Sequence, residues 1–393
     1  MAFSGAPNFL RSRNGHQRAR VTNIELFFDL VFVFAITQLS HSLLGNLTLD
    51  GAIHTLLLFL AVWWVWIYTS WVTNWLDPDR VPVRLLLLVL MVAGLVLSTS
   101  IPAAFEDKGL AFAIAFVIMQ VGRSLFALWA LGNHNVRHRR NFVRITSWLA
   151  VSGLFWLAGG LFADHRLAFW ITALVIEYIA PSTGFWLPGL GRSTTDEWDV
   201  EGGHMAERCS LFVIIALGES VLVTGATFAN LPWGWDSVAA FLVAFASSLA
   251  MWWIYFDKAA ERGSEHITHS SDPGRLARLA YTYFHLFIIA GIVVGAVADE
   301  LILAHPHGQL DPWVMTAVLG APAIYLIGNL LFKTAIAGRP PLSHMVGLAL
   351  LLLIGLVAPN LSSLGLGAAA TMALVVTAIW ETISLNRGPK PAA

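Results

Sequence analysis

Residues Pro82–Ile101 read PVRLLLLVLMVAGLVLSTSI, a run of 20 residues in which Arg84 is the one charged residue. A helix of roughly 20 apolar residues can cross the hydrocarbon core of a bilayer, which is about 30 Å thick. The 393-residue chain as a whole is 57% hydrophobic and 12% charged, and its mean hydropathy is +0.70. Because a soluble protein carries about 25% charged residues, the sequence predicts a polytopic membrane protein.

Similar apolar runs recur along the chain, and we predict twelve transmembrane helices, six in each half. The predicted spans of the first half are Ile24–Leu44, Ala52–Leu76, Pro82–Ile101, Leu110–Leu131, Phe142–Phe162 and Leu167–Pro181. The predicted spans of the second half are Met205–Phe228, Ser237–Phe256, Leu276–Leu303, Pro312–Phe332, Ser343–Leu361 and Gly365–Leu385.

The basic residues predict the direction of these helices, because cytoplasmic loops carry the excess of Lys and Arg. With a cytoplasmic N-terminus and twelve crossings, 20 of the 23 Lys and Arg residues fall on the cytoplasmic side. Lys108 and Arg166 fall on the other side, and Arg123 lies within a span. No convincing signal-peptide cleavage site follows the first apolar run, which carries Glu25 and Asp29. We therefore expect that this run is a retained helix and that both termini are cytoplasmic.

Landmarks of the first half recur in the same order in the second half, which indicates an internal duplication. The paired landmarks are Glu25 and Glu207, Trp63-Trp64-Val65-Trp66 and Trp252-Trp253-Ile254-Tyr255, Asp77-Pro78 and Asp272-Pro273, Gly122-Arg123 and Gly328-Asn329, and Glu177 and Glu381. An even number of helices per repeat makes both repeats enter the membrane in the same sense. The predicted fold is therefore an all-α integral membrane protein of two parallel six-helix repeats, over residues 21–181 and 205–387. A basic tail (1–20), a cytoplasmic linker (182–204) and a C-terminal tail (388–393) complete the chain.

Charged residues inside the predicted spans are the first candidates for a functional site, since such groups usually face the bundle interior and have a partner. Asp29 lies a full turn deeper than Glu25, and we expect it to form an internal ion pair. Glu25 has the alternative interpretation of an interfacial carboxylate near the start of a helix. Arg123 needs a counter-charge, and Asp29, Glu177 and Glu219 are the available acids. A structural ion pair and a role in conduction or binding are both open for Arg123.

Four further residues complete the candidate set. Glu219 lies between two small residues near the middle of its span, and it ranks with Asp29 as a site candidate. Arg208 lies eleven residues earlier on nearly the same face, roughly 16 Å away along the helix axis, too far for direct pairing. Its neighbour Glu207 begins the apolar part of the same helix. His285 is the one deep histidine, either a hydrogen-bonded core residue or a proton relay.

The motifs of soluble catalysis and of metal binding are missing from the sequence. There is no P-loop, GxSxG, HExxH or GxGxxG pattern, and Cys209 is the one cysteine. A net charge of −1 gives no general attraction to nucleic acid. We therefore expect no metal, no cofactor and no nucleic-acid partner. The expected partners are the lipid bilayer and a small ion or solute, and the sequence leaves a homodimer open.

Two separated motifs resemble those of a known family. Residues 25–34, ELFFDLVFVF, resemble the first motif of the bacterial low-temperature-requirement A (LtrA) family. Residues 204–208, HMAER, followed by Leu217-Gly218-Glu219-Ser220, resemble its second motif. The resemblance covers roughly Arg20–Leu385 and implies a multi-pass protein of the bacterial inner membrane. Residues 20–29 are also similar to the first helix of lysosomal-type potassium channels, except that Phe28 stands where those channels carry serine.

Two classes of function follow from these patterns. The first is a channel or transporter for a small ion or solute, with Asp29, Arg123, Glu177 and Glu219 lining an intramembrane pathway. The alternative is a non-transporting membrane protein, either an intramembrane lipid-modifying enzyme or a stress-related structural partner. An enzyme needs a catalytic set that the sequence does not offer at recognisable spacing, so we expect no enzyme. Parallel duplication and intramembrane charges of both signs favour transport.

Overall fold

The computed structural model describes residues 9–11, 20–132, 136–195, 198, 200–257, 259–268, 270, 272–308 and 310–387. Within these ranges the chain is helical, with two isolated β-bridges and no β-strand. Most of the predicted N-terminal tail, the C-terminal tail 388–393, Lys258 and the linker acids Asp196, Glu197 and Asp199 lie outside the described residues. The helices group into two compact units, Met1–Arg208 with Ile267–Arg278, and Cys209–His266 with Leu279–Ala393. We call them unit 1 and unit 2 and describe each by itself.

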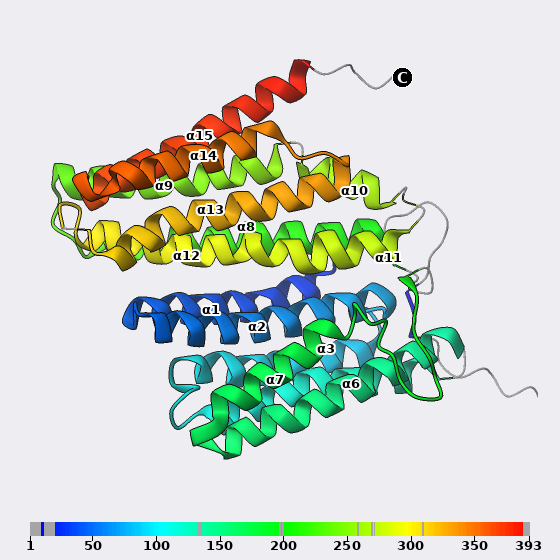
Figure 1. The fold of residues 1–393 in the computed structure, drawn as a ribbon. Coiled ribbons are helices and arrows are strands. Elements are labelled where there is room, and N and C mark those ends of the chain that lie inside the picture. Colours follow the sequence, from blue (N-terminus) through cyan, green and yellow to red (C-terminus); the bar gives the residue numbers. More distant parts are fainter. Residues whose placement is uncertain are drawn as a thin grey trace, which may run out of the picture. The chain divides into compact units, whose positions relative to one another are not determined.

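Unit 1 contains six long helical segments, shown from blue to green in Figure 1. They are α1 (Asn23–Gly45), α2 (Leu49–Trp75), α3 (Val81–Ser100), α4 and α5 (Gly109–Val117 and Arg123–Leu131), α6 (Val136–Leu161) and α7 (Arg166–Ile179). A π-helical turn, Ile118–Gly122, joins α4 to α5. Short 3-10 turns lie at Ile101–Ala103 and Ala163–His165. Unit 1 also includes the start of α8 (Gly202–Ala229) and the short α11 (Pro273–Leu276).

Unit 2 takes up the rest of α8 and runs to the end of the chain. Its further helices are α9 (Trp235–Phe256), α10 (Ala259–Thr268) up to His266, α12 (His285–Ala304), α13 (Pro312–Ala337), α14 (Leu342–Val357) and α15 (Ser363–Arg387). A π-helical stretch, Ala277–Phe284, leads into α12, and a 3-10 turn, Ala358–Asn360, follows α14. No apolar run predicts the polar helix α10.

All twelve predicted apolar runs are helical, but one is shorter than a membrane span. Eleven helical segments in the described ranges are long and apolar enough to cross a bilayer. The run Leu167–Pro181 forms α7, whose 14 residues extend about 21 Å at 1.5 Å per residue. This length falls short of the hydrocarbon core of about 30 Å. By length and composition, the described helices therefore support eleven of the twelve predicted spans, and the sixth is a helix shorter than a full span.

The outer faces of the helices are as apolar as the inner ones. On α3, Leu87 and Leu90 are 1% exposed, whereas Leu85, Val89 and Val92 form an outward stripe with 56–64% exposure. Apolar side chains on both faces are expected when the surroundings are lipid rather than water. Helix α2 is different, because its central turns are buried on all sides, with Trp63, Trp64 and Trp66 each at most 2% exposed. Helix α2 is therefore the central helix of unit 1.

Candidate functional site

An ion pair between α1 and the first turns of α8 lies at the centre of unit 1. The Arg208 guanidinium donates from Nη2 to Asp29 Oδ1 at 2.8 Å, and both side chains are fully buried. Trp66 Nε1–H of α2 donates to the same carboxylate oxygen at 2.8 Å. Arg208 also reaches Ser70 Oγ at 3.3 Å and lies 5.7 Å from the centre of the Trp66 ring. The structure therefore confirms the expectation that Asp29 takes part in an internal ion pair.

This pair does not use all of its hydrogen-bonding capacity. Asp29 Oδ2, Arg208 Nε and Arg208 Nη1 are buried, and none has a hydrogen-bond partner in the described part of the chain. Most buried polar atoms in folded proteins are hydrogen-bonded to protein or to water. Three free polar atoms around one buried pair thus indicate a place where water or a polar ligand can bind.

A second cluster lies one helical turn away and is centred on Glu25. His204 Nε2 lies 2.9 Å from Glu25 Oε1, and Arg11 Nη2 donates to Glu25 Oε2 at 2.9 Å. The backbone N–H and the hydroxyl of Thr22 also donate to Glu25 Oε2, so the carboxylate caps the start of α1. Glu25 is fully buried. These contacts support the interpretation of Glu25 as a carboxylate at the start of a helix, and His204 and Arg11 cover it.

The two clusters form matching rungs between the same two helices. Glu25 pairs with His204, and Asp29 pairs with Arg208. From the first pair to the second, the chain advances by four residues along α1 and by four residues along α8. Four residues is about one helical turn. The beginning of α8 therefore lies beside α1 and runs in the same direction.

A third cluster surrounds Arg123, and an amide takes the place of a direct ion pair. Arg123 Nη2 donates to Gln120 Oε1, and Gln120 Nε2 donates to Glu177 Oε2 at 2.9 Å. Ser152 Oγ and Trp156 Nε1 donate to the other oxygen of Glu177. Arg123 makes no direct ion pair with an acid in the described ranges. The predicted counter-charge Glu177 is thus linked to Arg123 through Gln120, which lies in the π-helical turn between α4 and α5.

Helix α2 connects the three clusters. Arg123 Nη1 donates to the Val65 carbonyl at 3.2 Å and to Thr69 Oγ1 at 3.0 Å. On its other faces α2 offers Trp66 and Ser70 to the Asp29–Arg208 pair, and Asn74 contacts His204 at 3.2 Å. We call the connected set the polar array of unit 1, and it consists of Arg11, Glu25, Asp29, Gln120, Arg123, Glu177, His204 and Arg208. With a neutral His204, its three arginines balance its three carboxylates.

The remaining predicted site residues lie outside this array. Glu207 is exposed and accepts a hydrogen bond from the backbone N–H of Val21 at 3.3 Å. Glu219 lies in the part of α8 that belongs to unit 2, where its side chain is half-buried. His285, also in unit 2, has Ala280 O at 2.8 Å from Nδ1 and the Tyr255 hydroxyl at 2.8 Å from Nε2. Both ring nitrogens of His285 are therefore hydrogen-bonded, as expected for a core histidine.

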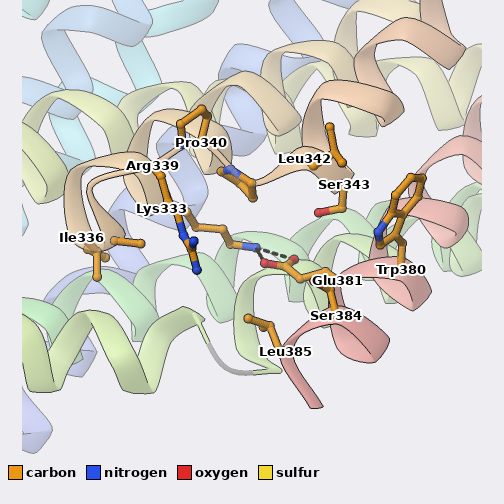
Figure 2. Close-up of a pocket in the computed structure, with 12 residues that line it drawn as sticks. Lys333, Ile336, Arg339, Pro340, Leu342, Ser343, Trp380, Glu381, Ser384 and Leu385 are labelled. Carbon is orange, nitrogen blue, oxygen red and sulfur yellow. Dashed lines mark hydrogen bonds and ion pairs between the residues drawn. The ribbon is translucent and has the colours of Figure 1, made fainter. Parts of the chain in front are cut away.

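Unit 2 has a buried ion pair of its own, beside a pocket of about 450 Å³. Lys333 Nζ of α13 donates to both carboxylate oxygens of Glu381 on α15, at 2.6 and 2.8 Å, and to the Ile254 carbonyl at 2.9 Å. Figure 2 shows Lys333 facing Glu381, with Arg339 on the lysine side of the pocket and Trp380 on the opposite side.

Comparison with known proteins agrees with the two sequence motifs. The family model for bacterial low temperature requirement A protein (LtrA) matches residues 20–379, which is most of the chain. The chain belongs to this family. It is also 41% identical over 394 residues to an uncharacterized protein of Rhizobium meliloti strain 1021, covering 98% of this chain and 94% of the relative. No solved structure matches the chain. Membership of the LtrA family and eleven long apolar helices together indicate a multi-pass membrane protein.

The structure brings the two sequence motifs into contact with each other. The first motif supplies Glu25 and Asp29, and the second supplies His204 and Arg208, so the two motifs bind each other through the rungs described above. His204 belongs to the second motif but is not among the site residues that the sequence predicts. Its spacing of four from Arg208, matching that of Glu25 and Asp29, is the sequence signal that would have identified it.

Gln120 is the other residue that the sequence did not single out, and its role is open to a direct test. Gln120→Leu leaves one donor of Arg123 and one oxygen of Glu177 without a partner. We expect a loss of about 2–6 kcal/mol in unfolding free energy, since each of the two unsatisfied buried groups costs about 1–3 kcal/mol. Thermal and denaturant unfolding in detergent would measure it. The matched control Met119→Leu, at the neighbouring buried position, should cost less than about 1.5 kcal/mol. Equal effects of the two variants would show that Gln120 does not join Arg123 to Glu177.

Proposed function

We propose that this LtrA-family protein is a channel or transporter for a small ion or solute, and that the polar array of unit 1 belongs to its pathway. The observation that carries the proposal is the buried Asp29–Arg208 pair with three polar atoms left free. A buried pair stabilises a fold only when its geometry is good and its remaining hydrogen-bonding groups are satisfied. This pair meets the first condition, but three of its polar atoms have no partner among the described residues.

The charge balance of the array suits the passage of a small charged species. None of the arginine–carboxylate contacts of the array is bidentate: Arg208–Asp29 and Arg11–Glu25 each share one hydrogen bond, and Arg123 reaches Glu177 through Gln120. A cation can take the place of an arginine beside a carboxylate, and an anion can take the place of a carboxylate beside an arginine. Ionisable residues inside membrane spans commonly mark such ion or substrate paths. The π-helical turn that carries Gln120 is of a kind often found at functional sites.

We also propose that the two halves are parallel six-helix repeats, and the ion pairs support this. Arg123 donates to the carbonyl of Val65, and Lys333 donates to the carbonyl of Ile254. Val65 and Ile254 occupy matching positions in the repeated tryptophan motif. Lys333 lies one helical turn after Asn329, the residue that aligns with Arg123. Each cation is also linked to an acid of the last helix of its half, Arg123 to Glu177 through Gln120 and Lys333 to Glu381 directly.

The proposal carries over the remaining sequence expectations. The protein would lie in the bacterial inner membrane with both termini in the cytoplasm, which requires α7 to cross together with the eleven long segments, and it would have no enzymatic activity. Glu219, half-buried in α8, stays a candidate site residue within unit 2. The rival proposal is a non-transporting scaffold, for which the same charges would only fix helix positions.

Flux through purified protein in liposomes tests the proposal. We expect a potassium, sodium or proton gradient to dissipate at least about tenfold faster than in protein-free vesicles, because a pathway lowers the cost of placing charge in the membrane. Vesicles containing heat-denatured protein serve as the control for leakage. A well-folded sample that shows no flux of these three ions, under gradients of both directions, would count against a channel or carrier for such ions and favour the scaffold.

A further inference from the structure

Asp299 of α12 is a buried carboxylate that the polar array of unit 1 does not explain. Its side chain is 7% exposed within one of the eleven long apolar helices. It makes no hydrogen bond or ion pair with any residue that the structure describes. An unpaired carboxylate at such a position is costly. Sequence reasoning missed it, although Asp299 is a charged residue within the predicted span Leu276–Leu303.

The Asp299 side chain lines a small cavity inside unit 2. Helices α9, α12, α13 and α15 surround this cavity, which has a volume of about 20 Å³. A cavity of about 10–15 Å³ already holds one water molecule, so the space accepts a single water-sized species. Gly295, Ala298, Ala321 and Gly367 line it, and their small side chains leave the space open.

Other oxygen atoms lie around the same cavity. Ser247 of α9 and Thr371 of α15 line it, and neither hydroxyl has a hydrogen-bond partner in the described chain. Elsewhere in the membrane helices such hydroxyls bond to the carbonyl four residues earlier, as Thr224 and Thr377 do. The hydroxyls of Ser247 and Thr371 are therefore available to a ligand.

A proline inside α13 adds a further oxygen. Pro322 lines the cavity together with Val318, the residue four positions earlier. Proline has no N–H, so it cannot donate the usual helical hydrogen bond to the carbonyl of Val318. Backbone carbonyls released from helical bonding are a common ligand for sodium in membrane transporters.

We propose that this cavity binds one partly dehydrated monovalent cation of about the size of sodium. The ligands are the carboxylate of Asp299, the hydroxyls of Ser247 and Thr371, and the Val318 carbonyl. Hard oxygen ligands suit such a cation. Asp299 is the one charged side chain lining the cavity, so a single positive charge neutralises the site and a divalent ion does not. The site concerns binding, and it stands whether or not unit 1 conducts.

Cation-dependent thermal stability of the purified full chain in detergent tests this site. Sodium chloride is titrated at constant ionic strength against N-methyl-D-glucamine chloride, and potassium and lithium chlorides follow. We expect sodium to raise the midpoint of unfolding saturably in the wild type. In Asp299→Asn the apparent affinity should fall at least about tenfold. Glu300→Gln, the neighbouring acid outside the cavity, is the matched control and should respond to sodium like the wild type.

Two further measurements keep the test decisive. Without sodium, Asp299→Asn should be at least as stable as the wild type, because it removes an unpaired buried charge. A lost sodium response then cannot be attributed to misfolding. Thr371→Val should weaken sodium binding several-fold while leaving sodium-free stability near that of the wild type. The proposal is overturned if Asp299→Asn keeps the wild-type sodium response. It is equally overturned if stability depends on pH through Asp299 but not on sodium, since the site would then take a proton only.

Discussion

Replacing Arg208 with methionine is expected to lower the unfolding free energy by about 3–5 kcal/mol, because it leaves the Asp29 carboxylate buried without its cation. Both side chains are fully buried, and the 2.8 Å contact with Arg208 is the one ion pair that Asp29 makes with a described residue. Denaturant unfolding in detergent micelles would measure the loss. Glu207→Gln, one residue earlier and exposed, is the control and should stay within about 0.5 kcal/mol of the wild type.

The double variant Asp29→Asn/Arg208→Gln separates loss of charge from loss of packing. Its two amides can keep the hydrogen bond from Trp66 and the contact between α1 and α8, while no charge is left unpaired. We expect it to recover most of the stability that Arg208→Met loses, since coupled residues in one pair do not act additively. If the double variant is as unstable as Arg208→Met, the ion pair itself is needed for folding and the present explanation is wrong.

The same double variant is expected to lose transport. In the proposed pathway, the moving ion takes the place of one partner in the Asp29–Arg208 pair. This needs a charge at each position, and the two amides carry no charge. We predict a fall in ion flux of at least about tenfold in a protein that stays folded, which corresponds to about 1.4 kcal/mol or more of lost interaction with the moving ion. If the Asp29–Arg208 pair only held helices together, the folded double variant would keep the wild-type flux.

The helices of the fold were largely predictable from the sequence because lipid imposes a simple rule on their length and composition. Apolar runs of about 20 residues mark the helices without any knowledge of their neighbours, and each predicted run is a helix. Helix α7 shows where the rule stops. The apolar run Leu167–Pro181 can be recognised, but only the structure shows that its helix ends at Ile179 after 14 residues.

The sequence predicts most of the charged residues of the candidate site but not which of them pair with each other. The sequence predicts a buried partner for Asp29. For Arg208, however, it suggests only Glu219 on the same helix as a possible partner, and that residue is too far away to pair. Counting of basic residues assigned Arg208 and Lys333 to the cytoplasmic side, although both are buried within their units. Tertiary packing decides which helices lie side by side. The spacing of residues along a single helix does not show which other helix they will face. Neutral residues such as Gln120 and Trp66 carry no signal in a search for charges.

Ion flux through liposomes containing the Asp29→Asn/Arg208→Gln variant, compared with the wild type and with Glu207→Gln at equal protein content, tests the central claim most directly. The polar array predicts flux in the wild type and in Glu207→Gln, and a reduction of at least about tenfold in the double variant. Wild-type flux from a folded double variant would show that the Asp29–Arg208 pair holds helices together and forms no part of a pathway.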